Sequence, residues 1–174
     1  VNRMIEPGEP GLDVVVSGAR AMINFWGEVD PKEQRAARRI LRQIGCGSLE
    51  RRYWRQASQG ERQKLLFGRA LMAKPKALFL DEPCAGLDPV ARESYLAFME
   101  ENAKRPRSPA LILVTHHVEE ITPAFTHALL LREGRVLASG RKEETLTSAN
   151  LSETLGAKVR LRRKDGWYAM TVAR

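Results

Sequence analysis

Two pairs of adjacent residues in this sequence could carry acid–base chemistry. Asp81 and Glu82 directly follow the apolar residues 77–80, and His116 and His117 follow a second apolar run. Short apolar runs without polar alternation are typical of strands buried on both faces of a parallel sheet. Ligands of such sheets bind outside the carboxyl ends of the strands, so we expect the carboxylates and a histidine along one crevice. Asp81 and Glu82 should point in different directions and can therefore do different jobs.

A third group, Ser58-Gln59-Gly60-Glu61, has the pattern of a capping box that begins a helix. The first turn of a helix presents unpaired N–H groups and the positive end of the dipole, and both favour a phosphate. Capping boxes also begin many helices that bind no ligand, so the pattern alone leaves both interpretations open. Asp88, followed by Pro89, similarly predicts the start of a helix after a turn at residues 85–87.

The elements that would position these residues alternate between helix and strand. Helices are predicted at residues 31–44, with Asp30 as N-cap and Gly45 at the end, at 59–73, and after Asp88. Strands are predicted at 77–80 and 110–115, hairpins around 133–134 and 165–166, and short helices at 143–146 and 151–155. Residues 12–18, with three consecutive valines, fit a short strand or a buried helix start by pattern alone.

Composition restricts the class of protein. The chain has 174 residues, 43% of them hydrophobic, which predicts a globular domain with its own core. Cys46 and Cys84 lie far apart without metal-ligand spacing, which suits a reducing compartment and favours a cytosolic protein. The apolar runs are strand-sized, and the first residues have no signal-peptide pattern.

Positive charge is concentrated in one segment. The formal net charge is +8, and ten Lys or Arg face three Glu between Lys32 and Lys64. Such a segment is a candidate for binding phosphate, nucleic acid or an acidic partner surface. A solvated helix face explains the same charges equally well.

The order of these motifs resembles the ABC ATPase family. Ser58 to Glu61 resembles the ABC signature, residues 77–82 the Walker B strand with its catalytic glutamate, residues 85–88 the D-loop, and His116 the switch histidine. In the signature, Ala57 replaces the usual leucine, Gln59 the first of two glycines, and Glu61 the glutamine. The run from Thr115 to Ile121 and the basic tail are similar to a branch of bacterial ABC ATPases related to iron and molybdate importers.

The resemblance implies an α/β fold with a P-loop NTPase-like (RecA-like) parallel-sheet core and an α-helical ABC subdomain, truncated at the N-terminus and followed by C-terminal β-hairpins. It implies three parts. Residues 1–75 would form the helical subdomain with the signature helix, and residues 76–140 the second half of the nucleotide-binding core. Residues 141–174 would hold the C-terminal helices and the basic hairpin.

The activity that the resemblance implies is hydrolysis of ATP to ADP and phosphate, with Mg²⁺ as cofactor. Asp81 would hold the ion, Glu82 would act as general base on the attacking water, and His116 would contact the γ-phosphate. The nucleotide of a second subunit would be bound across the dimer by Ser58, Gln59, Gly60, Glu61 and Asp88. Catalysis of this kind depends mainly on positioning and charge neutralisation.

The implied partners are a second ABC ATPase subunit, in a homodimer, and membrane permease subunits. The protein would then be cytoplasmic or peripheral at the inner face of the membrane. No G-x-x-x-x-G-K-[ST] sequence is present, so we expect the N-terminal half with Walker A to be missing and this polypeptide alone to bind ATP poorly. A fragment, a split protein and a degenerate pseudo-ATPase all fit. The fragment is favoured because Glu82, His116 and Asp88 are all present.

Two other functions fit parts of the sequence. SMC-like ATPase lobes also combine a signature, a Walker B strand and a switch histidine without Walker A, and the basic segment would suit DNA. No heptad repeat precedes Ser58, however, which disfavours this function and a nucleic-acid partner. A non-catalytic interaction module that keeps only the fold is the second alternative.

Overall fold

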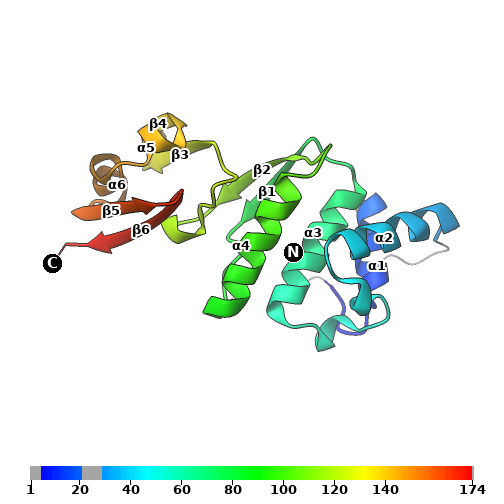
Figure 1. The fold of residues 1–174 in the computed structure, drawn as a ribbon. Coiled ribbons are helices and arrows are strands. Elements are labelled where there is room, and N and C mark those ends of the chain that lie inside the picture. The colour runs from blue at the N-terminus through cyan, green and yellow to red at the C-terminus, as the bar shows by residue number, and fades with distance from the viewer. Residues whose placement is uncertain (1–4, 21–28, 174) are drawn as a thin grey trace. The chain divides into compact units, whose positions relative to one another are not determined.

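The computed structural model describes residues 5–20 and 29–173. The chain divides into two compact units, Val1–Ile112 and Leu113–Arg174. Figure 1 shows that the first unit holds most of the helices and that the second holds two β-hairpins. The predicted division into residues 1–75, 76–140 and 141–174 remains a prediction. None of the helices in the described ranges has the length and apolar character that a membrane crossing requires.

The described part of the first unit, residues 5–20 and 29–112, is built around four α-helices. They are α1 (Gly11–Val16), α2 (Pro31–Gln43), α3 (Gln59–Met72) and α4 (Pro89–Ala103), with 3₁₀ turns η2 (Ser17–Arg20), η3 (Gly47–Leu49) and η4 (Trp54–Gln56). The valine-rich segment at residues 12–18 is therefore helical, as the family resemblance implied. Asp30 is the N-cap of α2, as predicted. Its carboxylate accepts a hydrogen bond from the Lys32 N–H at 2.7 Å.

The core of this unit lies where α1 packs against α2 and α3. Its fully buried side chains include Val14, Val15, Leu41, Ile44 and Leu65. The chain just after α1 runs very close to α3. A Cβ atom on Gly18 would lie 1.9 Å from the carbonyl oxygen of Arg69, so only glycine fits between these backbones.

Both cysteines, Cys46 and Cys84, belong to this unit and are buried. Burial raises the pKa of the Cys46 thiol to about 11, which keeps the thiol protonated and unreactive at neutral pH.

Strand β1 (Ala77–Asp81) is hydrogen-bonded to β2 (Ala110–Val114) in a two-stranded sheet. The connection through α4 is the crossover that parallel neighbours require. The prediction that both faces of these strands are buried is wrong for the described chain. Leu80 is 7% exposed, but Phe79 is 68% and Val114 47% exposed. Burial alternates along each strand because the described elements cover only one face of this sheet.

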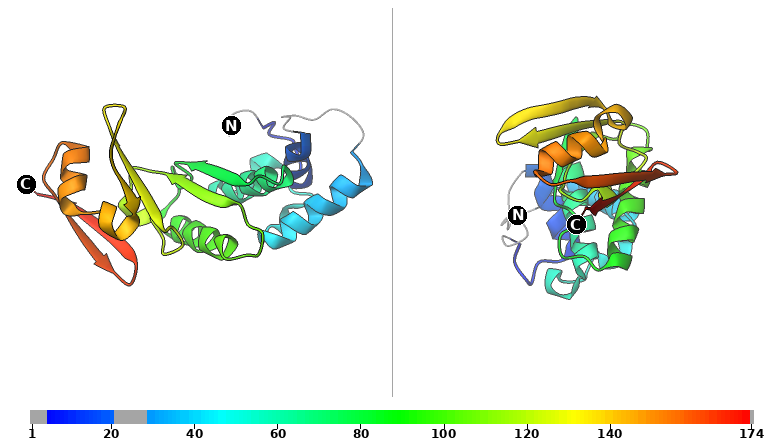
Figure 2. Two further views of the ribbon diagram at one scale, coloured as in Figure 1. Left: turned by 90° about the horizontal axis from the view of Figure 1, so that it is seen from above. Right: turned by 90° about the vertical axis from the view of Figure 1, so that its left-hand side faces the viewer.

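The second unit contains two hairpins with helices between them. Its elements are η5 (Val118–Glu120), β3 (His127–Arg132), β4 (Arg135–Arg141), α5 (Lys142–Thr145), α6 (Ser148–Leu155), β5 (Val159–Lys164) and β6 (Trp167–Val172). Both predicted hairpins are confirmed, as are the two short helices and the stop at Gly156, whose φ is +65°. Figure 2 shows α6 beside the β5–β6 hairpin.

The core of the second unit is small and separate. Buried residues from five elements and loops meet in it: Val118, Leu146, Leu151, Val159 and Tyr168. Partly buried residues such as Leu161 and Met170 surround them. One face of the β5–β6 hairpin is therefore fixed toward this core, and the other face is exposed.

The close backbone approach at Gly18 is testable by substitution. We expect Gly18→Ala to lower the free energy of unfolding by about 2 kcal/mol or more, because the new Cβ must displace the α3 backbone at Arg69. Gly8→Ala is the matched control, since nothing lies within 4 Å of its added Cβ, and it should change stability by no more than about 0.5 kcal/mol. Urea unfolding followed by circular dichroism measures both. Equal stability of the two variants would contradict the packing described.

Candidate functional site

The carboxylates of the site lie at the end of β1. Asp81 is the last residue of the strand and is exposed, and Glu82 follows it half-buried. Glu82 has a left-handed backbone with φ +46°, which is uncommon for a residue other than glycine. The chain turns sharply there, with the Ala85 N–H bonded to the Glu82 carbonyl at 3.0 Å. Strained backbone of this kind is concentrated at functional sites.

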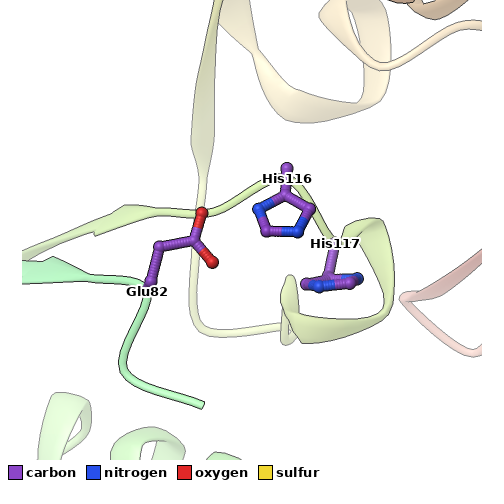
Figure 3. A group of neighbouring side chains, drawn as sticks. All are labelled: Glu82, His116 and His117. Atoms are coloured by element: carbon purple, nitrogen blue, oxygen red, sulfur yellow. The ribbon is translucent and has the colours of Figure 1, made fainter. Parts of the chain in front are cut away.

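The histidines follow β2, the strand hydrogen-bonded to β1. Their rings are neighbours, with centroids 4.0 Å apart. Thr115 organises this turn, because its hydroxyl accepts from the His117 N–H at 3.0 Å and donates to the Glu120 carboxylate at 2.7 Å. Figure 3 shows Glu82 leaving β1, and His116 and His117 leaving β2 before η5. The two partners of the turn, Thr115 and Glu120, were not among the predicted site residues.

The start of α3 is held by the predicted capping box. The Ser58 hydroxyl accepts from the Glu61 N–H at 3.3 Å, and the Glu61 carboxylate accepts from the Ser58 N–H at 2.8 Å. Its other oxygen accepts from Arg52 at 3.1 Å, a partner that sequence reasoning missed because it lies in an irregular loop. Glu61 is thus engaged in holding the helix start, while Gln59 and Gly60 form the first turn.

The start of α4 is capped by Asp88 in the same way. One carboxylate oxygen accepts from the N–H groups of Val90 and Ala91, both at 2.9 Å. A Cβ atom on Gly60 would lie 3.8 Å from the Cβ of Ala91, so the first turns of α3 and α4 lie side by side. Ser58 and Asp88 are both exposed. The structure therefore brings together the signature-like and D-loop-like residues within the first unit.

This arrangement has a simple electrostatic consequence. Each helix start carries a partial positive charge from its dipole, and the two starts adjoin. A negatively charged group of a ligand would be attracted to such a surface. Asp81, an exposed carboxylate at a strand end, suits a hard cation such as Mg²⁺, which keeps several waters and takes few carboxylates directly.

Comparison with known proteins identifies the family. Residues 7–85 match the family described as ABC transporter. The chain is 43% identical to the uncharacterized ABC transporter ATP-binding protein YmeB of Lactococcus lactis, over 94% of this chain and 63% of the relative. It is 38% identical to the uncharacterized ABC transporter ATP-binding protein YlmA of Bacillus subtilis, over 87% of this chain and 58% of the relative.

A third relative has a substrate in its name. The molybdenum import ATP-binding protein ModC of Rhodopseudomonas palustris is 39% identical over 58% of this chain and 26% of its own length. The chain thus spans less than two thirds of each of these relatives.

Solved structures agree on the fold. A transporter described as of the metal-chelate ABC type, in an inward-facing conformation, matches 95% of this chain and 66% of its own with a TM-score of 0.79 at 22% identity. An ATP-binding cassette in its ADP conformation matches 79% of this chain and 57% of its own with a TM-score of 0.66 at 22% identity. These likenesses define the P-loop NTPase fold of ABC ATPases.

The chain is a homologue of the ATP-binding proteins of ABC transporters, which confirms the family predicted from its motifs. Its relatives include molybdenum import ATP-binding proteins, in agreement with the predicted branch. The roles of the individual residues in this chain remain predictions.

The capping role of Ser58 can be separated from any role in binding. Ser58→Ala removes the acceptor for the Glu61 N–H and should lower the free energy of unfolding by about 1 kcal/mol, whereas Ser58→Gly should lower it by only a few tenths. Ser48→Ala, on an exposed serine of η3, is the control and should have little effect. Thermal unfolding distinguishes the three. An Ala variant as stable as the unaltered protein would show that the hydroxyl cap contributes nothing.

Proposed function

We propose that this chain supplies the signature, Walker B, D-loop and switch-histidine residues of an ATP-hydrolysing subunit in an ABC-type transporter. The reaction is ATP + H₂O to ADP + phosphate, coupled to transport by separate permease subunits. The observation that supports this most directly is strand pairing. The strand that precedes Glu82 and the strand that precedes His116 are hydrogen-bonded neighbours in a homologue of ABC ATP-binding proteins.

The residues at the strand ends would divide the chemistry. Asp81 would hold Mg²⁺, which neutralises phosphate charge when bound. Glu82 would take a proton from the attacking water as general base. His116 would donate to the γ-phosphate and orient the water, and His117 would be its bystander. The left-handed backbone at Glu82 marks the sharp turn by which the chain leaves β1.

The adjoining starts of α3 and α4 would face a second subunit. Ser58 and Gly60, with Gln59 and Glu61 beside them, would bind the γ-phosphate of the nucleotide that the second subunit holds. Asp88 would link the two sites across the dimer. The capping bonds support this role because they hold the exposed first turns in a defined geometry.

This chain would need a complementary segment for activity. It spans 63% of YmeB and contains no G-x-x-x-x-G-K-[ST] sequence, so the backbone loop and lysine that hold the β-phosphate must come from elsewhere. The chain alone should therefore bind ATP weakly. The complete subunit would be cytoplasmic, at the inner face of the membrane, as a homodimer on its permease.

The role of Glu82 is tested in a chimera that joins this chain to the phosphate-loop part of the YmeB cassette. Glu82→Gln should lower the ATP hydrolysis rate about 10²-fold or more while ATP binding is retained, because the amide cannot accept the proton of water. Glu93→Gln makes the same chemical change at an exposed residue of α4, and it should leave the ATP hydrolysis rate and ATP binding unchanged. Unaltered hydrolysis by the Glu82 variant would exclude the assigned role.

The two adjacent histidines offer a second matched pair. In the same chimera, His116→Ala should lower the rate of phosphate release about 10²-fold, since a donor to the transferred phosphate is lost. His117→Ala should keep at least half of the activity, although it removes the same side chain one residue further on. Phosphate release at saturating ATP measures both, and a reversed order of effects would show that the wrong histidine has been assigned.

A further inference from the structure

The exposed face of strand β5 carries four cations in one line. Lys158 lies just before the strand, and Arg160, Arg162 and Lys164 follow at alternate positions. All four side chains are exposed. Alternate residues of a strand point to the same face and advance about 6.7 Å per pair, so the line is about 20 Å long. We call these four residues the β5 cation row.

The orientation of the row is fixed by the core behind it. Val159 lies between Lys158 and Arg160 along β5, and Tyr168 of β6 pairs with Arg163 on the face opposite the row. Val159 and Tyr168 are each 5% exposed and belong to the core of the second unit. A shift of the strand register by one residue would bury the charged side chains and expose these apolar side chains. The row therefore faces solvent because of packing and is not a product of flexible side chains alone.

No acidic residue of β6 pairs with a residue of the β5 cation row. Arg160 pairs with Thr171, Arg162 with Ala169, and Lys164 with Trp167. Among the described residues, Arg163 forms the ion pair of β5, with Glu143 at 3.4 Å. Arg163 lies on the face of the strand opposite the row. Like charges along one face repel each other, so this face suits an anionic partner.

The outer edge of β5 is already occupied. The N–H groups of Val159 and Leu161 donate to the hydroxyls of Ser152 and Ser148, both at 3.0 Å. These serines belong to α6, which lies beside the strand (Figure 2). Addition of a partner strand at this edge is thus blocked, and a ligand must be bound by the side chains of the face.

We propose that the β5 cation row binds the phosphate backbone of single-stranded nucleic acid without sequence preference. A single line of cations matches a linear polyanion, whereas a membrane surface is matched by charge spread over two dimensions. The small side chains of Ala169 and Thr171 leave the row open along one side. Trp167, half-buried at one end of the row, offers a ring on which a base can stack.

This inference goes beyond the proposed ATPase and is independent of it. The missing heptad repeat before Ser58 disfavours an SMC-like lobe that binds DNA through the basic segment from Lys32 to Lys64, which is a different surface in the first unit. The row lies wholly in the second unit and requires no nucleotide, dimer or permease.

The expected salt dependence of oligonucleotide binding follows from the number of phosphates that the row neutralises. Four contacts predict a slope of about −2.8 for the logarithm of the binding constant against the logarithm of salt concentration. Affinity should therefore fall about 50-fold between about 50 and 200 mM salt. The dissociation constant at the lower salt should be on the order of 10⁻⁵ M.

Fluorescence anisotropy of the whole chain with a labelled oligothymidylate of about 12 nucleotides tests the inference. The double variant Arg160→Gln/Arg162→Gln should weaken binding at least tenfold at low salt and reduce the slope to about −1.4. Arg163→Gln, on the same strand but the opposite face, should change the affinity by less than twofold. Circular dichroism of all three proteins establishes that the hairpin is folded.

Three results would overturn the proposal. One is oligonucleotide binding that the double variant leaves unchanged, which would locate the contact elsewhere, for instance on α2. Another is binding to phosphatidylserine-rich vesicles that depends on Arg160 and Arg162, with none to the oligonucleotide. Equal losses with Arg163→Gln and with the double variant would also refute it, because net charge rather than the row would then decide binding.

Discussion

The signature-like segment of this protein depends on how the chain satisfies the first N–H groups of α3. Ser58 and Glu61 exchange two hydrogen bonds, and Arg52 holds the second Glu61 oxygen. Without such partners the N–H groups of the first turn would need water, and the helix start would fray. The capped start of α3 meets the start of α4 at Gly60 and Ala91. The carboxylates of Glu61 and Asp88 lie at these two helix starts, where the positive ends of the dipoles favour negative charge.

Sequence patterns predicted the parts of the fold that local interactions decide. The caps at Asp30, Ser58 and Asp88 formed as expected because each needs only residues within one turn. The hairpins formed where Glu133-Gly134 and Asp165-Gly166 take the positive φ values of tight turns. In each case the determining contact spans only a few residues, so the printed sequence contains all of its partners.

Contacts between distant segments were not predictable in the same way. The apolar residues of β1 indicated burial on both faces. An apolar run, however, shows only that a strand is suited to contact other apolar surfaces. Phe79 is exposed because the described elements cover the other face of the sheet. The Thr115–Glu120 bond and the Arg52–Glu61 pair lie in turns without periodicity, and so no pattern marked them. Residue roles that involve a second subunit depend on contacts outside this chain altogether.

The two basic surfaces of the chain are held by different elements. On α2, Arg38 pairs with Glu50 of a following turn at 2.9 Å, and Glu33, the acid of this helix, pairs with Arg20 at 3.2 Å. Exposed ion pairs of this kind contribute little to stability. On β5, within the part of the chain that the structure describes, the cation with such a partner is Arg163, which lies on the opposite face and pairs with Glu143. Register, core packing and the serine-capped edge all hold the remaining charges in one line, so the hairpin retains their repulsion unless a polyanion neutralises it.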